Sequence, residues 1–224
     1  MNAIPDYLQQ TYDWAYIRPG AVRLFERAWL VDLILWGNYR RLGDAALEAL
    51  GEELPGRTLQ IACVYGNLSA RIAARVPRDG QFEVIDVLPV QLENLRRKLP
   101  PDARVRISQQ DSTALTVPDA SQDRALLFFL MHEQPTHARV RSIAEALRVV
   151  KPGGQVIFVD FAKPHWWHPL RYLWLPVLRL LEPFAPDIWR AGPETWLPPS
   201  PLIAKMERTT YFGGMYQRIV LTKV

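Results

Sequence analysis

The most informative segment for the fold is Leu59-Gln60-Ile61-Ala62-Cys63-Val64-Tyr65-Gly66-Asn67-Leu68-Ser69. It reads as a short apolar strand that leads through Gly66 into a helix. Asp86 ends the next apolar run 20 residues after Gly66, the spacing of a carboxylate that accepts hydrogen bonds from ribose hydroxyls. Asp111-Ser112-Thr113-Ala114-Leu115 follows the third run, where an adenine would lie. In this order the pieces predict an adenosine ligand, although an aspartate at a strand end can also be a cap or a solvated turn.

Around this stretch, short apolar runs alternate with helical segments. The runs expected to be strands are residues 58–64, 82–86, 105–109, 125–131 and 155–160. A helix is expected at 137–150, where Lys151-Pro152-Gly153-Gly154 ends it. Residues 208–212 and 216–222 flank Gly213-Gly214 and predict an antiparallel hairpin. The pattern predicts an α/β fold whose mainly parallel sheet ends in an antiparallel strand.

The length of 224 residues favours a single domain with added elements. Within 1–224 we expect an N-terminal helical cap at 1–56 and a nucleotide-binding core at 57–160. An apolar insertion at 161–207 and a final strand pair at 208–224 follow. The cap contains Trp29 to Trp36, which is apolar on nearly every side. Such a helix is expected to be buried, or to face lipid or an apolar ligand.

The composition narrows the classes of function. With 49% hydrophobic and 22% charged residues, the chain is typical of a globular protein. Lys and Arg exceed Asp and Glu by only 27 to 23, without a basic stripe, so nucleic acid is not an expected partner. A single cysteine, Cys63, excludes an internal disulfide and agrees with a reducing compartment. We read no secretory signal at the start, and no apolar run approaches the ~18 residues of a membrane span.

The order of Gln60 to Gly66, Asp86, Asp111 to Leu115 and Leu147 to Gly154 resembles the S-adenosylmethionine-dependent methyltransferases of the Rossmann-like class. The resemblance implies their fold, with N-terminal helices and a helical, aromatic-rich insertion before the last strand pair. The first loop of that family usually reads acid-x-Gly-x-Gly-x-Gly. Here Gln60 stands at the acid position, and Ala62 and Val64 stand at the first two glycine positions. The altered loop argues against ordinary methyl transfer.

A sharper resemblance is to the rhodoquinone biosynthesis proteins, methyltransferase-like enzymes with this altered loop. It rests on Tyr12 to Tyr16, Leu30 to Tyr39, Ala62 to Leu68, Gln91 to Leu99, Phe128 to Pro135, His168 to Tyr172 and Leu180 to Phe184. The resemblance implies conversion of ubiquinone to rhodoquinone, in which an amino group replaces a ring methoxy group. It implies S-adenosylmethionine as amino donor, manganese(II) as helper and ubiquinone as substrate.

Carried onto this chain, the donor site would comprise Gln60, Ala62, Val64, Gly66, Asp86, Val87, Asp111 and Ser112. An amine must be unprotonated to attack a quinone, and a nearby carboxylate would favour its charged form. We therefore expect Gln60 and Tyr65 to take part in catalysis by letting the amino end of the donor turn and lose its proton. The alternative is that the residues of this loop simply pack together.

Candidate metal ligands follow the fourth and fifth expected strands. His132 and Glu133 supply an imidazole and a carboxylate, ligands that suit manganese, and Asp160 could add a third. A metal at this place could polarise the quinone carbonyl, so we also count His132 and Glu133 as candidate catalytic residues. His132 can equally be a hydrogen-bonded residue of the pocket wall, and Glu133 a helix cap.

Ubiquinone is a lipid, so the protein is expected to meet a bilayer. The insertion carries Trp166-Trp167 and an apolar stretch from Leu170 to Leu181 that Arg171 and Arg179 interrupt. This pattern is typical of an interfacial segment, although a helix packed over the sheet is the alternative. Candidate residues for stacking on the quinone ring are Tyr12, Trp14, Tyr16 and Tyr39. We expect a cytoplasmic protein, peripheral at the inner face of a bacterial cytoplasmic membrane.

Two other functions remain open from the sequence. One is a conventional methyltransferase that acts on a quinone or another lipid. The other is a non-catalytic lipid-binding module that retains a degraded nucleotide fold. Retention of both Asp86 and Asp111 favours an enzyme over the binding module. The oligomeric state is left open.

Overall fold

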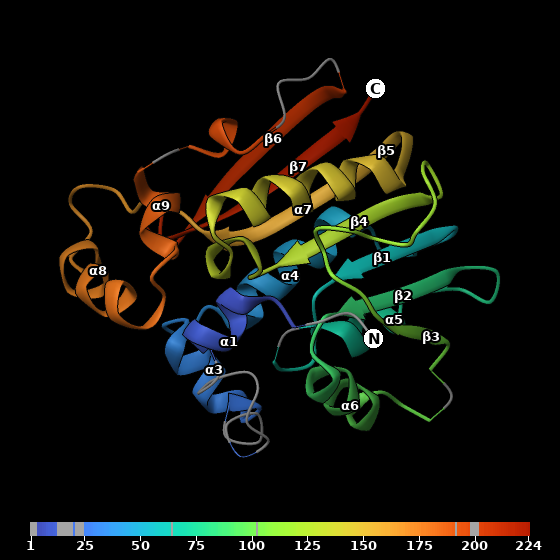
Figure 1. Ribbon diagram of the computed structural model, residues 1–224, viewed down its shortest axis with the longest axis horizontal. Helices are drawn as coiled ribbons and strands as arrows, with labels where there is room; N and C mark the ends of the chain where they lie inside the picture. Colours follow the sequence, from blue (N-terminus) through green and yellow to red (C-terminus); the bar gives the residue numbers. More distant parts are fainter. Residues whose placement is uncertain are drawn as a thin grey trace. The chain divides into compact units, whose positions relative to one another are not determined.

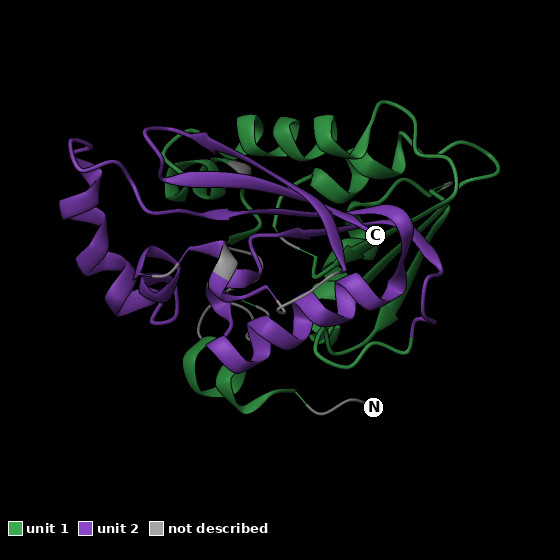
Figure 2. Ribbon diagram, turned by 90° about the horizontal axis from the view of Figure 1, so that it is seen from above, with its two compact units in different colours: residues 1–116 green, residues 117–224 purple. Residues whose placement is uncertain are grey.

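The computed structural model describes residues 4–12, 20, 25–63, 65–101, 103–190, 192–197 and 202–224 (Figure 1). The chain forms two compact units, residues 1–116 and 117–224, which Figure 2 distinguishes by colour. Unit 1 contains α1 (Asp6–Tyr12), α3 (Ala28–Ile34), α4 (Tyr39–Leu50), β1 (Arg57–Ile61), α5 (Leu68–Ala73), β2 (Gln81–Asp86), α6 (Pro89–Lys98) and β3 (Val105–Gln109). Unit 2 contains β4 (Gln122–Phe128), η2 (Met131–Glu133), α7 (Thr136–Val149), β5 (Val150–Phe161), α8 (Leu170–Leu181), α9 (Ala185–Arg190), η3 (Pro193–Thr195), β6 (Ile203–Tyr211) and β7 (Tyr216–Lys223).

In unit 1 the strand order is β3-β2-β1, and both pairings are parallel. Every residue of β1 except Arg57 is buried, as expected of a strand covered on both faces. Helix α6 packs on β2 and β3, and it buries Leu92 and Leu95. The carboxyl ends of β1 and β2 therefore meet at one edge, where the loops of the predicted donor site begin.

In unit 2 the strand order is β4-β5-β7-β6. Strands β4 and β5 are parallel, whereas β7 runs antiparallel to both β5 and β6. The expected antiparallel ending of the sheet is therefore confirmed. Helix α7 packs on β5 and buries Ile143, Ala146 and Leu147 on its inner face.

Several element boundaries differ from the sequence prediction. Strand β4 ends at Phe128 instead of residue 131, because Phe129 adopts a positive φ of 54° that turns the chain. Helix α7 ends at Val149 as expected, but Lys151 to Gly154 belong to β5 and form no turn outside it. Strand β6 begins at Ile203, five residues before the predicted start, and takes these residues from the expected insertion. Most of β6 is exposed, so it lacks the apolar alternation by which a strand is detected.

The loop between β1 and α5 is held by the side chain of Gln60, which is fully buried. Its Nε2 donates to the carbonyl oxygen of Ala62 at 3.1 Å, and its Oε1 accepts the Ser69 hydroxyl at 2.9 Å. Ala62 adopts φ +68°, a backbone conformation that favours glycine. Gln60 thus ties the loop to the first turn of α5, and its amide donates at one end and accepts at the other, which a carboxylate cannot do.

We predict that Gln60→Glu lowers the free energy of unfolding by about 2 to 4 kcal/mol at neutral pH, because a buried carboxylate would face the Ala62 carbonyl oxygen. Ser69→Ala is the matched control; it removes one bond of the same amide and should cost about 1 kcal/mol. Chemical denaturation measures both. Once protonated, the introduced carboxyl group can donate to Ala62, so the deficit of Gln60→Glu should shrink as the pH falls toward ~5. An equal, pH-independent loss in both variants would contradict this account.

Candidate active site

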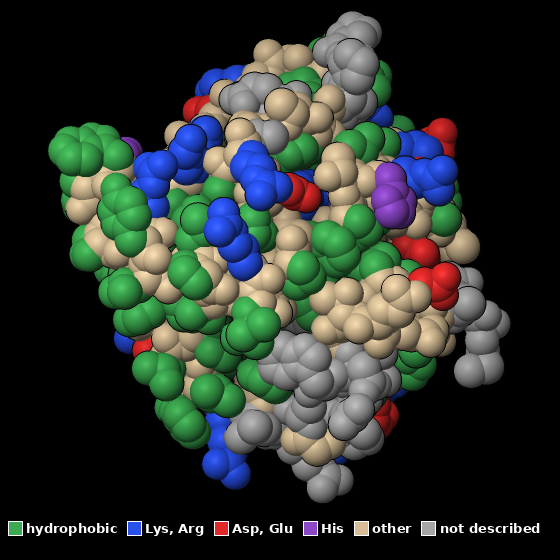
Figure 3. Space-filling model, turned by 60° about the vertical axis from the view of Figure 1, so that its left-hand side comes forward, with side chains coloured by type: hydrophobic (Ala, Val, Ile, Leu, Met, Phe, Trp, Pro, Cys, Tyr) green, Lys and Arg blue, Asp and Glu red, His purple; other side chains and the backbone are tan. Residues whose placement is uncertain are grey.

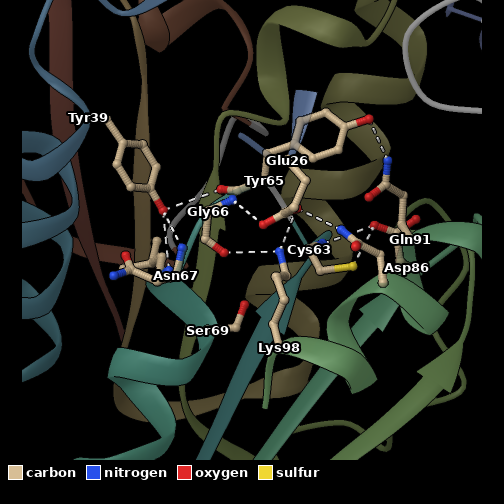
Figure 4. Close-up of polar contacts among 12 residues, drawn as sticks. Glu26, Tyr39, Cys63, Tyr65, Gly66, Asn67, Ser69, Asp86, Gln91 and Lys98 are labelled. Carbon is tan, nitrogen blue, oxygen red and sulfur yellow. Dashed lines mark hydrogen bonds and ion pairs between the residues drawn. The ribbon is translucent and has the colours of Figure 1, made fainter. Parts of the chain in front are cut away.

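The first cluster of polar residues lies in unit 1, where the loop after β1 meets the end of β2 (Figure 4). The Asp86 carboxylate accepts the backbone N–H of Cys63 at 2.9 Å and that of Leu88 at 2.8 Å. The Cys63 thiol also donates to it at 3.4 Å. Burial raises the pKa of Asp86, and these hydrogen bonds oppose the rise. Asp86 therefore lies against the predicted donor loop, while its binding of ribose stays a prediction.

The Cys63 thiol is a hydrogen-bond partner of the Asp86 carboxylate. Burial, followed by the negative charge of Asp86, raises the pKa of the Cys63 thiol well above its usual value. A thiol that keeps its proton at neutral pH is a poor nucleophile. Cys63 is therefore a structural residue of the loop.

Tyr39, the first residue of α4, holds the start of α5. Its hydroxyl accepts the backbone N–H groups of Asn67 at 3.0 Å and Leu68 at 3.2 Å, and it donates to the Tyr65 carbonyl oxygen at 3.3 Å. Asn67 itself makes no capping bond with its side chain. Burial raises the pKa of Tyr39, so the hydroxyl stays protonated and can serve both roles. The structure gives the Tyr39 hydroxyl a capping role, and stacking of its ring on a substrate stays a prediction.

Glu26, Asn94 and Lys98 also belong to this cluster, although none of them was predicted as a site residue. Figure 4 labels Glu26 and Lys98 beside Gly66. Glu26 Oε1 accepts the backbone N–H of Gly66 at 3.1 Å, and Glu26 Oε2 accepts Asn94 Nδ2 at 2.7 Å and Lys98 Nζ at 3.0 Å. Lys98 Nζ also donates to the Gly66 carbonyl oxygen at 3.0 Å. One available signal was the spacing of Gln91, Asn94 and Lys98, which places three polar side chains on one face of α6.

Tyr65 and Gly66 occupy the middle of the loop. The Tyr65 ring stacks on Phe25, with centroids 5.9 Å apart, and its hydroxyl accepts Gln91 Nε2 at 3.0 Å. Gly66 has φ +88°, and a Cβ at this position would collide with the Tyr39 hydroxyl. Glycine is therefore required at residue 66 by both its backbone conformation and its neighbour. A catalytic role for Tyr65 stays a prediction.

The other predicted binding residues are placed as follows. Asp111 Oδ1 accepts the backbone N–H and the hydroxyl of Thr113, both at 2.8 Å, which forms the turn after β3. Tyr12 is fully buried, so it offers no open ring face to a substrate. Val87 follows Asp86 at the end of β2, and Ser112 lies in the turn after β3. Val64, Trp14 and Tyr16 lie outside the described residues.

A second cluster lies in unit 2 and centres on Asp160 and His132, both of which are buried. Asp160 Oδ1 bonds His132 Nδ1 at 2.9 Å and accepts the backbone N–H of Phe161 at 2.7 Å. Asp160 Oδ2 accepts the backbone N–H groups of Met131 at 2.8 Å and His132 at 3.3 Å. Four donors therefore hold this carboxylate and fix the bend that follows β4.

Two further carboxylates face the other nitrogen of His132. Its Nε2 lies 3.9 Å from Glu133 Oε1 and 3.9 Å from Glu182 Oε2. Burial disfavours the charged imidazole, but the charges of Asp160, Glu182 and Glu133 outweigh it and raise the pKa of His132 to about 9. His132 is therefore an imidazolium at neutral pH. Glu182, which follows α8, was not predicted as a site residue.

The His132 ring is enclosed by aromatic side chains and a buried arginine supports its loop. The ring packs edge to face against Phe161, at a centroid distance of 4.8 Å, and against Phe129 at 5.8 Å. Arg139 is fully buried and donates to the carbonyl oxygens of Met131 and Gln134, both at 2.8 Å. The segment that carries His132 is thus fixed from two sides.

The predicted manganese ligands His132, Glu133 and Asp160 do come together, but they do not fit a metal ion as placed. All four acceptor positions of Asp160 are used by N–H donors, one of them His132 Nδ1, so this carboxylate has no lone pair left for a metal ion. Among the described ranges, no group of three or more His, Cys, Asp or Glu side chains is arranged to hold a metal ion. Manganese stays a prediction without support.

We predict that His132 makes stability depend on pH. Its pKa in the folded protein is about 9, above the usual value of 6.5, so the folded state binds the proton more tightly. The resulting stabilisation is complete below about pH 6.5 and is lost as the pH rises toward 9, by an amount on the order of 1 to 3 kcal/mol. Denaturation between pH 6 and 9 measures it. His132→Gln should flatten this part of the curve; parallel curves for the two proteins would refute the assignment.

The part of the chain that carries the first cluster is similar to known proteins. Residues 58–154 match the family described as "Methyltransferase domain". A demethylmenaquinone methyltransferase of Deinococcus radiodurans is 29% identical over 191 residues, which cover 78% of this chain and 75% of that protein. A ubiquinone/menaquinone biosynthesis C-methyltransferase of Idiomarina loihiensis is 28% identical over 136 residues, 59% of this chain and 53% of that protein. The chain thus matches about half of the length of the second relative.

Solved structures show the same fold at low sequence identity. A SAM-dependent methyltransferase from Aquifex aeolicus matches with a TM-score of 0.59 and 16% identity, over 93% of this chain and 100% of that one. Human N-acetylserotonin methyltransferase in complex with SAM matches with a TM-score of 0.65 and 13% identity, over 98% of this chain and 60% of that one. Residues 58–154 are therefore similar to a methyltransferase domain, and the chain has the Rossmann-like fold of S-adenosylmethionine-dependent methyltransferases.

Proposed function

We propose that the protein converts ubiquinone to rhodoquinone by replacing a ring methoxy group with an amino group that S-adenosylmethionine donates. The observation that carries the proposal is the buried amide of Gln60 at the position where methyltransferases usually have an acid. Its donor end faces a carbonyl oxygen and its acceptor end takes a hydroxyl, so a carboxylate would not serve there. The loop therefore requires a neutral side chain at this position.

The residues around the loop fit S-adenosylmethionine. The Gly66 N–H binds a carboxylate in this structure, that of Glu26, so the loop offers a donor to an anionic group. Lys98 adds a positive charge beside it, and the Asp86 carboxylate lies at the end of β2, where ribose hydroxyls would be held. Gly66, Lys98 and Asp86 would thus hold the donor, whose nitrogen displaces the ring methoxy group as methanol. The bond between this nitrogen and the donor α-carbon must then break. In a balanced step the α-carbon is oxidised to a ketone whose oxygen comes from water, and the quinone ring takes up the two electrons and two protons as the aminohydroquinone.

The charges near Gly66 suit a donor whose amino group must lose its proton. A carboxylate at residue 60 would favour the ammonium form of that group, and Gln60 carries no charge. The Glu26 carboxylate is offset by its ion pair with Lys98, at 3.0 Å. Gln60 thus adds no charge that would hold the amine in its protonated form, and a neutral amine can attack the electrophilic ring.

We predict that incubation of the protein with ubiquinone and S-adenosylmethionine yields a quinone in which amino replaces methoxy. Mass spectrometry of the recovered quinone measures the change. Donor labelled with heavy nitrogen at its amino group should transfer the label to the product. A labelled donor that yields an unlabelled aminoquinone would exclude it as the nitrogen source. Because the metal ligands do not fit, the reaction is run with and without manganese(II).

A second candidate is a conventional methyltransferase that acts on a quinone, and the relatives favour it. Proteins similar to this chain are named as methyltransferases of demethylmenaquinone and of ubiquinone or menaquinone biosynthesis. The same mass measurement separates the candidates, because this reaction adds a methyl group and leaves the methoxy groups in place. An unchanged quinone would favour the third reading, a lipid-binding module.

An exposed apolar surface in unit 2 supports a lipid substrate. We define the α8 patch as the exposed residues Trp166, Trp167, Tyr172, Leu173, Leu180 and Leu181. Trp166 is 74% exposed and Leu180 is 81% exposed, and within α8 only Leu178 is buried. Figure 3 shows hydrophobic side chains gathered on the side that carries α8, with Lys and Arg side chains among them. Aromatic and basic residues beside an apolar patch are typical of a helix at a bilayer surface.

We further propose that the α8 patch binds an anionic bilayer, at the inner face of the bacterial cytoplasmic membrane, where ubiquinone is met. Among the helices in the described part of the chain, none is long and apolar enough to cross a membrane. Arg179 lies in the last turn of α8 and supplies positive charge toward anionic headgroups. The proposed contact is therefore peripheral.

We predict that replacing Trp166, Leu173 and Leu180 together with Ser weakens binding to phosphatidylglycerol vesicles at least about tenfold, because each loses buried apolar area at the bilayer. Vesicle cosedimentation measures binding. Met206→Ser, on the exposed strand β6, is the control and should bind as the wild type does. Unchanged vesicle binding by the triple variant would remove the α8 patch from the proposal.

A further inference from the structure

Glu26 brings a carboxylate to the donor loop from outside the methyltransferase domain. It precedes α3, whereas the domain match begins at residue 58. One carboxylate oxygen binds the Gly66 N–H, and the other binds Lys98 and Asn94 (Figure 4). Lys98 in turn donates to the Gly66 carbonyl oxygen, so the backbone N–H and the carbonyl oxygen of Gly66 both have a side-chain partner. The side chains of Lys98 and Glu26 are only 19% and 22% exposed, which shields their ion pair from solvent.

The partners of Glu26 form a site for a carboxylate. A backbone N–H, a side-chain amide and an ammonium group converge on its two oxygens, at 3.1, 2.7 and 3.0 Å. Charge-assisted hydrogen bonds of this kind are stronger than neutral ones. The amino-acid end of S-adenosylmethionine carries a carboxylate of the same size and charge. The chain thus fills, with its own side chain, a site that suits one end of the proposed donor.

We propose that the Gly66 N–H and the Lys98 ammonium form the subsite for the α-carboxylate of the donor, and that Glu26 occupies it until the donor binds. This inference rests on the proposed function in one respect, that the donor is S-adenosylmethionine. The donor carboxylate replaces Glu26 on Gly66 and Lys98, and Glu26 keeps its bond to Asn94.

Competition between Glu26 and the donor carboxylate lowers the apparent affinity for the donor. Only the fraction of molecules in which Glu26 has left the subsite can accept the donor carboxylate. The apparent affinity for the donor is therefore the intrinsic affinity multiplied by that fraction. A ligand without a carboxylate does not compete with Glu26. The subsite therefore distinguishes adenosine compounds by whether they carry an amino-acid end.

Calorimetry with two probes tests the proposal. S-adenosylhomocysteine carries the amino-acid end, and methylthioadenosine lacks it. Glu26→Gln should bind S-adenosylhomocysteine about 3- to 10-fold more tightly than the wild type, and methylthioadenosine with unchanged affinity. Lys98→Met should weaken S-adenosylhomocysteine about tenfold and leave methylthioadenosine unchanged. Glu93→Gln is the matched control; it removes the same charge from an exposed residue of α6 and should change neither affinity.

Each other outcome overturns the inference. Weaker binding of S-adenosylhomocysteine by Glu26→Gln would mean that Glu26 binds the amino group of the donor. An unchanged affinity would mean that Glu26 does not compete, and parallel changes with both probes would mean a purely structural role. If the wild type binds neither probe, the proposed donor itself fails, and this subsite fails with it. Because only binding is measured, the result does not depend on which group the enzyme transfers.

Discussion

In the loop between β1 and α5, the Ala62 N–H donates to the Ile85 carbonyl oxygen of β2 at 2.9 Å. Other backbone N–H and C=O groups of this loop need partners outside the strands. Side chains from elsewhere in unit 1 provide them. Gln60 binds the Ala62 carbonyl oxygen, Asp86 the Cys63 N–H and Tyr39 the N–H groups that open α5. Glu26 and Lys98 bind the two polar groups of Gly66. The shape of the candidate donor site depends on this set of hydrogen bonds.

This arrangement explains how the loop tolerates its departures from the methyltransferase pattern. Ala62 adopts a conformation that favours glycine, at a cost on the order of 1 kcal/mol. Gln60 and Asp86 hold Ala62 in this conformation, because they bind the carbonyl oxygen and the N–H of the peptide group between Ala62 and Cys63. The acid that is missing at residue 60 has a counterpart in Glu26, which comes from the N-terminal part of unit 1 and is neutralised by Lys98. The charge near the loop is thus set by a pair of side chains, not by one.

In unit 2 a buried carboxylate, that of Asp160, binds the backbone N–H groups of the segment after β4. Asp160 receives four N–H donors, including the imidazolium of His132, and this network fixes the segment after β4. Burial of a carboxylate is tolerated because each of its acceptor positions is used. The same saturation leaves Asp160 no capacity for a metal ion. What the sequence suggested as a ligand set is instead a hydrogen-bonded core that orients one cationic histidine.

The α/β class, the places of most strands and the helix α7 could be predicted from the amino-acid sequence, because apolar periodicity is a local property that a sheet and its helices must satisfy. The position of Asp86 beside the loop after β1 could also be predicted, since parallel strands end at the same edge. The side chains that complete the sites could not be predicted and are known from the fold alone. Glu26 meets Lys98 across 72 residues and Tyr39 meets Asn67 across 28, and such pairs leave no pattern in the local sequence. Tyr39 carries a ring that suits a ligand as well as a core, and its capping role follows only from where the fold places its hydroxyl.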